Sequence, residues 1–112
     1  MELKERKESD ALIVKVLEKR FAANVPAKFK EEMADRIEKG NDRIVLDISD
    51  VEFIDSAGLA ALVHTLKLLP QKDKFLICGA QGPVKNVFEL TRMDKVFQMY
   101  ADEKAAISAL TT

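Results

Sequence analysis

Several kinds of residue and segment are scarce in this chain, and each scarcity excludes a class of protein. Cys78 is the only cysteine, so no disulfide can form within the chain, and a reducing compartment is expected. His64 is the only histidine and lies in a different predicted element, so neither a metal ion nor another cofactor is expected. No run of about 18 apolar residues occurs, and the charged segment 1–10 holds no signal-peptide core. The sequence therefore predicts a cytoplasmic protein without membrane insertion.

The chain also lacks an excess of charge of either sign. Its 18 Lys and Arg residues and 19 Asp and Glu residues give a net charge of -1, which offers no electrostatic reason for direct binding to nucleic acid. The charges of residues 28–39 alternate in sign, while Phe29, Met33 and Ile37 recur every fourth residue. This pattern predicts an amphipathic helix with one solvated face.

The chain has the size and composition of one folded domain, with 112 residues of which 47% are hydrophobic. We predict a single domain over residues 3–110, with residues 1–2 and 111–112 at its ends. Strand-like and helix-like runs alternate, which favours an α/β fold on a mixed, mainly parallel sheet of about five strands with four helices. Only the first two strands are expected to form an antiparallel hairpin, at the N-terminus. The strands are predicted at 3–7, 11–17, 43–48, 74–78 and 96–100, and the helices from Asn24 to Gly40, from Ser56 to before Pro70, from Pro83 to about Leu90, and after Asp102.

The segment Asp55-Ser56-Ala57-Gly58 lies where an apolar strand stops and an apolar helix begins. Serine is a favourable N-cap, and the first free backbone N–H groups of a helix can bond either its hydroxyl or an anion. Two interpretations of Ser56 follow from this segment alone: a residue that only caps the helix, or a hydroxyl presented where a phosphate can be held.

The residues around Ser56 do not form a known catalytic set. His64 follows eight helical residues later, a rise of roughly 12 Å, and no G-x-S-x-G elbow surrounds the serine. Asp47, Asp50 and Asp55 lie close in sequence, but no phosphate-binding glycine loop accompanies them. We therefore expect no catalytic residues, no metal ligands and no enzyme activity. A phospho-aspartate receiver domain is disfavoured because one carboxylate, Glu18, and two cations follow the strand 11–17.

Phosphorylation of Ser56 offers a different kind of function. A phosphate adds about -1.5 to -2 charge, which the helix start stabilises by roughly 0.3 to 2 kcal/mol. The neighbouring Asp55 opposes it. The fold is expected to survive the modification, whereas a partner packed over the serine would face a desolvated dianion. Every ~1.4 kcal/mol lost at such a contact costs tenfold in affinity.

The run 44–62, IVLDISDVEFIDSAGLAAL, resembles the signature of STAS domains, named for sulphate transporters and anti-sigma factor antagonists. The resemblance extends more loosely over residues 3–110. It implies that the protein is an anti-sigma factor antagonist with Ser56 as its phosphoacceptor. The implied partner is an anti-sigma factor that is also a serine kinase, bound by the unphosphorylated domain and released by phosphorylation, with a phosphatase reversing the modification. The partner-binding residues that it implies are Asn24, Asp55, Ala57, Gly58, Ala60 and Ala61.

An alternative within the same family is a constitutive scaffold subunit of a signalling or lipid-transport complex, with Ser56 only capping its helix. Two departures from the family pattern bear on the partner surface. The segment 19–24 reads Lys-Arg-Phe-Ala-Ala-Asn, with Ala22 in a stretch where the family often has Gly and Asp. Arg92 stands where the family often has Gly. The oligomeric state is left open by the sequence.

Overall fold

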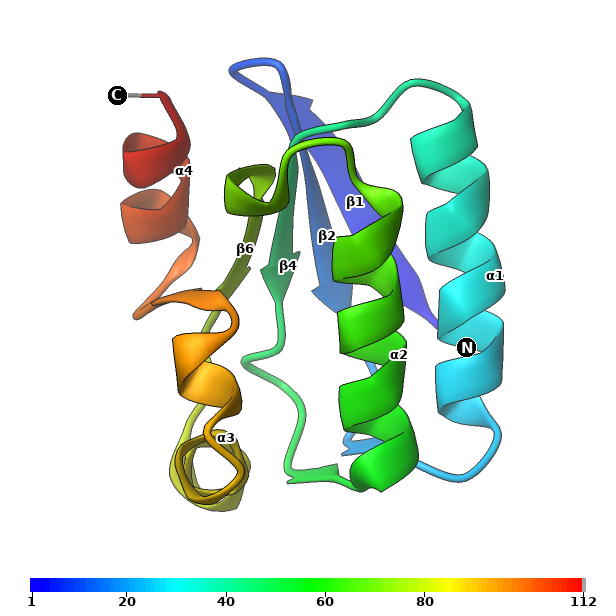
Figure 1. Cartoon of the computed structure of the whole chain (residues 1–112), viewed down its shortest axis with the longest axis vertical. Helices are drawn as coiled ribbons and strands as arrows, with labels where there is room; N and C mark the ends of the chain where they lie inside the picture. The colour runs from blue at the N-terminus through cyan, green and yellow to red at the C-terminus, as the bar shows by residue number, and fades with distance from the viewer. Residues whose placement is uncertain (112) are drawn as a thin grey trace.

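The computed structural model describes residues 1–111 and contains a five-stranded sheet with helices on both faces (Figure 1). The first two strands pair antiparallel and every other pair in this sheet is parallel, as predicted. Ser9 and Asp10 both have positive φ, 52° and 64°, which suits the tight turn of a hairpin. The strand order is β1-β2-β4-β6-β7: β1 Leu3–Glu8, β2 Ala11–Val16, β4 Ile44–Asp47, β6 Phe75–Cys78 and β7 Gln98–Tyr100.

Four α-helices divide between the two faces of the sheet (Figure 1). Three of them cover the larger core: α1 Val25–Glu38, α2 Ser56–Leu68 and α3 Gly82–Leu90. The fourth, α4 Glu103–Thr111, packs on the other face against a smaller apolar cluster that includes Ile13, Val45 and Cys78. Short 3-10 turns at Lys72–Lys74 and Met93–Lys95 precede β6 and β7. The predicted single α/β fold with four helices is confirmed.

A second, two-stranded sheet was not predicted from the sequence. It pairs β3 Arg20–Phe21 in parallel with β5 Phe53–Ile54. Each strand has only two residues, which is too short for an alternating pattern to reveal. The pair joins the segment before α1 to the segment before α2, so both helices start from the same small sheet. Phe21 then reaches the core and packs edge-on against Phe29, with ring centroids 5.0 Å apart.

Three local predictions about helix and strand ends are corrected by the structure. Asn24 holds the N-cap position of α1, but its backbone is helical and its side chain makes no capping hydrogen bond. The last strand begins at Gln98, whereas the prediction began at Val96, which is 47% exposed and ends a 3-10 turn. Ser56 is the first helical residue of α2 and Asp55 is its N-cap. By contrast, the predicted cap at Asp102 is confirmed, because its carboxylate accepts a hydrogen bond from the Ala105 N–H at 2.8 Å.

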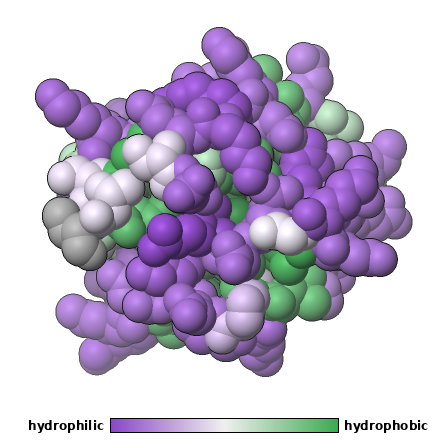
Figure 2. Space-filling view, turned by 90° about the horizontal axis from the view of Figure 1, so that it is seen from above, coloured by the Kyte–Doolittle hydropathy of each residue, from purple (hydrophilic) through white to green (hydrophobic). Residues whose placement is uncertain are grey.

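The carboxyl ends of β2, β4 and β6 lie at the lower end of the molecule in Figure 1, where α2 begins. Figure 2 views the opposite end, at which α1 and α2 finish, and its surface is mainly hydrophilic with small separate hydrophobic areas. Among residues 1–111, no helix has both the length and the apolar character needed to cross a membrane.

Candidate functional site

The site is built where the loop after β4 delivers the chain to β5 and α2. Asp55 has an extended backbone, with φ -104° and ψ -177°. Its two carboxylate oxygens contact backbone N–H groups of two different segments. Oδ1 accepts a hydrogen bond from the Gly58 N–H at 2.8 Å. Oδ2 lies 3.4 Å from the Ala23 N–H, which donates to it from the turn before α1. Asp55 therefore caps α2 and fastens it to the start of α1.

Ser56 is exposed at the first position of α2. Of the two interpretations of Ser56, the one in which it only caps the helix is wrong, because the capping bond comes from the Asp55 carboxylate. Both residue types are favourable caps, so composition alone did not separate them; the extended backbone of Asp55 and the helical placement of Ser56 decide it. Within residues 1–111 the Ser56 hydroxyl has no hydrogen-bond partner. A free, solvent-facing hydroxyl at a helix start is well placed to accept a phosphoryl group.

The other implied partner-binding residues divide into accessible and buried positions. Asn24, Ala57 and Ala60 are exposed, and Asp55 is half-buried. Gly58 and Ala61 are buried and face the interior. A Cβ on Gly58 would lie 2.5 Å from the Phe21 carbonyl oxygen, so only glycine lets α2 approach β3 this closely. The structure thus brings Asn24, Asp55, Ala57 and Ala60 to one surface around Ser56 and places Gly58 and Ala61 beneath it.

Arg20 and Phe53 flank this region as a pair that sequence reasoning missed. The Arg20 guanidinium carbon lies 4.2 Å from the centroid of the Phe53 ring, within the range of a cation–π contact. Phe53 is 41% exposed although it is large and apolar. The two residues are 33 positions apart and meet only because β3 pairs with β5. An aromatic residue immediately before the predicted junction was the only signal available in the sequence.

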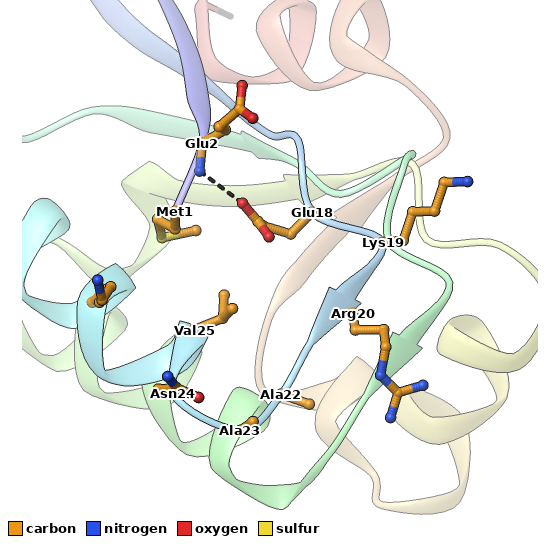
Figure 3. Close-up of a pocket in the computed structure, with 10 residues that line it drawn as sticks. Met1, Glu2, Glu18, Lys19, Arg20, Ala22, Ala23, Asn24 and Val25 are labelled. Atoms are coloured by element: carbon orange, nitrogen blue, oxygen red, sulfur yellow. Dashed lines mark hydrogen bonds between the residues drawn. The ribbon is translucent and has the colours of Figure 1, made fainter.

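The unusual segment 19–24 forms the edge of an open groove of about 750 Å³ (Figure 3). Lys19, Arg20 and Lys28 are among its lining residues, and in Figure 3 the Lys19 and Arg20 side chains point away from Met1 and Val25. Glu18 accepts a hydrogen bond from the Glu2 N–H at 2.7 Å, which ties β1 to the end of β2. The departure from the family pattern in this segment therefore changes the surface beside α1 and leaves the Asp55 cap intact.

The second departure, Arg92, keeps the backbone that a glycine would supply. Its φ is 63°, in the left-handed region that glycine adopts most readily. The turn between α3 and the following 3-10 turn is therefore retained, and a guanidinium is added to it. The difference from the family pattern is one of surface charge.

An acidic pair, the buried Asp47 and the half-buried Glu103, lies on the α4 side of the sheet, away from α2. Asp47 is 7% exposed and accepts a hydrogen bond from the Ser49 N–H at 2.9 Å. Burial raises the pKa of Asp47, but hydrogen bonds from Glu103 and Ser49 and the charge of Lys15 outweigh it, so the pKa lies below its ordinary value. The pKa of Glu103 is raised, first by its hydrogen bond to Asp47 and then by burial. When the pair holds a single proton, these two shifts favour that proton on Glu103.

Neither the acidic pair nor the single thiol forms a metal centre. In the described part of the chain no three His, Cys, Asp or Glu residues gather in a way that suits a metal ion. Burial, followed by the nearby charges of Asp47 and Glu103, raises the pKa of Cys78 to about 12. His64 is exposed on α2, two turns beyond Ser56, as the sequence predicted.

The fold and the strand-to-helix junction at Asp55 and Ser56 are those of one class of domain: the chain belongs to the STAS domain family, whose model matches residues 2–106. The resemblance stated from the run 44–62 is confirmed. Its relatives are anti-sigma factor antagonists. The chain is 30% identical to BtrV of Bordetella bronchiseptica, a proposed antagonist, over 86 residues, 76% of this chain and 74% of BtrV. It is 29% identical to the anti-sigma F factor antagonist of Paenibacillus polymyxa over 70 residues, 62% of this chain and 60% of that protein.

Solved structures agree with this assignment. An anti-sigma factor antagonist from Mycobacterium paratuberculosis superimposes with a TM-score of 0.89 over 99% of this chain and 94% of its own; at 23% identity this likeness shows the shared fold. A proposed antagonist from Thermotoga maritima gives a TM-score of 0.85 at 25% identity, over 98% of this chain and 95% of its own.

Proposed function

We propose that this protein is an anti-sigma factor antagonist whose binding to an anti-sigma factor is controlled by phosphorylation of Ser56. The observation that carries the proposal is that the capping residue of α2 and the proposed phosphoacceptor are two different residues. Asp55 makes the capping hydrogen bond to Gly58, and the Ser56 hydroxyl is left exposed without a partner. Ser56 can therefore be modified without removing a bond that holds the helix.

A phosphate at Ser56 is compatible with the folded state. It would stand at the N-terminus of a 13-residue helix, where the helix dipole favours negative charge by roughly 0.3 to 2 kcal/mol. Repulsion from Asp55, one residue away, opposes this gain. The two effects are of similar size, so we expect the domain to remain folded and the change to be felt at the surface.

The surface around Ser56 suits close contact with another protein. The exposed residues beside it are small or short, namely Ala57, Ala60 and Asn24, so a partner backbone can approach the serine closely. Gly58 lets α2 pack tightly on β3 beneath this surface, and Ala61 is also buried on α2. A partner bound here would remove water from Ser56. A phosphate on Ser56 would then be buried without a counter-ion, which is costly, so the partner would dissociate.

In this proposal the partner proteins catalyse both the phosphorylation and the dephosphorylation of Ser56. The anti-sigma factor acts as the serine kinase and supplies ATP and the catalytic residues, and a phosphatase removes the phosphate. The protein itself acts by binding. Because sigma factors and their regulators work in the bacterial cytoplasm, we place the protein there.

Mass spectrometry after incubation with kinase and ATP tests the assignment of Ser56. The kinase is the purified serine-kinase anti-sigma factor whose gene lies nearest to that of this protein. We expect a single phosphate on Ser56 and none on the Ser56→Ala variant. Stoichiometric phosphate on another residue, with Ser56 unmodified, would exclude Ser56 as the acceptor.

Binding measurements with the same anti-sigma factor test the switch. We expect Ser56→Ala to bind like the wild-type protein and Ser56→Glu to bind at least about tenfold more weakly. Ser108→Glu is a matched control, because it adds the same charge to an exposed serine on α4. Equal binding by Ser56→Glu and wild type would favour the constitutive scaffold. In that alternative Ser56 has no capping role either, because Asp55 provides the cap.

A further inference from the structure

The surface beside the phosphoacceptor continues into a second groove, which lies between α2 and the turn that follows α3. It encloses about 490 Å³ and is open to solvent. Its apolar floor is made by partly buried side chains that pack against the main core, Leu59 and Val63 from α2 and Met93 from the turn. Its remaining lining residues are Ala60, His64, Lys67 and Thr91.

The groove lies along the same face of α2 as Ser56. Ala60 follows Ser56 by four residues and His64 follows Ala60 by four, a spacing that places successive side chains one above another on a helix. Ser56 therefore stands one helical turn before the first groove residue. A protein segment seated in the groove would run toward the phosphoacceptor.

The ionisable side chains that line the groove are His64 and Lys67, and neither is acidic. Arg92 lies between the lining residues Thr91 and Met93. None of these three side chains forms an ion pair within residues 1–111. The acidic residues of the same segment, Glu89 and Asp94, line a separate hollow. The basic groups are therefore available to a partner.

A large apolar side chain is also exposed to solvent at the end of α3, next to the groove residue Thr91. Leu90 ends α3 immediately before Thr91 and is 84% exposed, the highest value among the large exposed hydrophobic residues. A leucine this exposed gains little from folding, since its apolar area stays in water. Burial against a partner would recover that contribution.

We propose that this groove receives a segment of the anti-sigma factor that carries apolar side chains flanked by carboxylates. The apolar side chains would contact Leu59, Val63 and Met93. The carboxylates would form an ion pair with Lys67 and accept a hydrogen bond from the His64 ring. This inference rests on the proposed function and extends it, because it names the chemistry of the partner surface. It also explains why phosphorylation would weaken binding rather than strengthen it: a phosphate on Ser56 would repel an acidic segment one turn away.

A charge reversal in the groove tests the inference. The variant is His64→Glu/Lys67→Glu, which places two carboxylates at exposed lining positions of α2 and removes the Lys67 cation. The control is Lys30→Glu, at an exposed lysine of α1 that forms no ion pair within the described residues. Affinity for the purified anti-sigma factor is measured by isothermal titration at low and high salt, and circular dichroism melts verify that each variant is folded.

We expect the double variant to bind at least about tenfold more weakly and the control to bind within about twofold of wild type. Wild-type affinity should fall as salt is raised, and the double variant should lose most of that dependence. A double variant that is folded and binds as tightly as wild type, or more tightly, would overturn the inference and leave the switch at Ser56 standing. Failure of the wild-type protein to bind any serine-kinase anti-sigma factor of its organism would overturn both.

Sedimentation of the protein alone distinguishes a second copy of this chain as the occupant. We expect the wild type and the double variant to sediment identically. A wild-type dimer that the double variant converts to a monomer, with anti-sigma factor binding unchanged, would assign the groove to self-association and overturn the proposal.

Discussion

The Asp55 carboxylate accepts a hydrogen bond from the Gly58 backbone N–H at 2.8 Å, and this bond, rather than one from Ser56, caps the start of α2. The same carboxylate also contacts the Ala23 N–H, so it joins α2 to the turn before α1. Asp55, which caps the helix, and Ser56, the proposed phosphoacceptor, are thus neighbours with different roles. This separation lets a charge be added at Ser56 while the scaffold is kept.

Stability measurements on neighbouring substitutions test this separation. We expect Asp55→Ala to lower the free energy of unfolding by about 0.5 to 2 kcal/mol, because the helix loses its N-cap. Ser56→Ala is expected to change it by less than about 0.5 kcal/mol, as for other exposed substitutions. Asp55→Asn should retain most of the stability, since asparagine also caps helices well. Chemical denaturation gives all three values, and a larger loss for Ser56→Ala than for Asp55→Ala would contradict the assigned cap.

The substitution Gly58→Ala tests whether close packing of α2 on β3 affects stability more than helix propensity does. Alanine favours a helix over glycine by about 1 kcal/mol. Here, however, its Cβ would lie 2.5 Å from the Phe21 carbonyl oxygen and 2.7 Å from Ile54 Cγ1. Because overpacking costs about 1 to 3 kcal/mol, we expect a net loss of stability in thermal unfolding. Ala60→Gly, at an exposed position of the same helix, calibrates the propensity difference. A stabilised Gly58→Ala protein would show that α2 can move away from β3 at little cost.

The shared proton between Asp47 and Glu103 predicts a pH dependence of stability. The pKa of Glu103 is raised above its ordinary value of 4.5 in the folded state. As pH rises from 4.5 through the folded pKa, the unfolded chain releases this proton first, so the contribution of Glu103 to stability declines. Glu103→Gln cannot ionise and should not show this decline. Unfolding free energies of both proteins are compared from pH 4.5 to 7; the difference should grow in favour of Glu103→Gln, and parallel profiles would refute the shared proton.

Cys78 should be nearly inert toward thiol reagents in the folded protein. It is fully buried, and its pKa is raised from 9.0 to about 12, which lowers the thiolate fraction near pH 8 about a thousandfold. Because the thiolate is the reactive form, labelling is expected only through opening of β6. Labelling kinetics with a chromogenic disulfide, with and without denaturant, measure this. Rapid labelling without denaturant would mean that α4 detaches readily from the sheet and exposes Cys78.

The residue pattern was sufficient for the main sheet and the four helices. Phe29, Met33 and Ile37 revealed α1, the apolar run at 44–46 revealed β4, and the Ser9-Asp10 pair revealed the hairpin turn. These elements were predictable because each repeats its pattern over several residues. The pair of short strands β3 and β5 was not predictable, because two residues carry no period and their partner lies 33 positions away.

By itself, the sequence determined the family and the fold class, because order and spacing in the run 44–62 are local properties of the chain. Ser56 as phosphoacceptor remains a prediction from the same run. Only the tertiary structure decided which neighbour caps α2, which implied contact residues are accessible, and that Arg20 stacks on Phe53. It also placed Leu59, Val63 and Met93 beneath one groove. These features depend on backbone angles and on contacts between distant segments, which packing fixes and which no local pattern encodes.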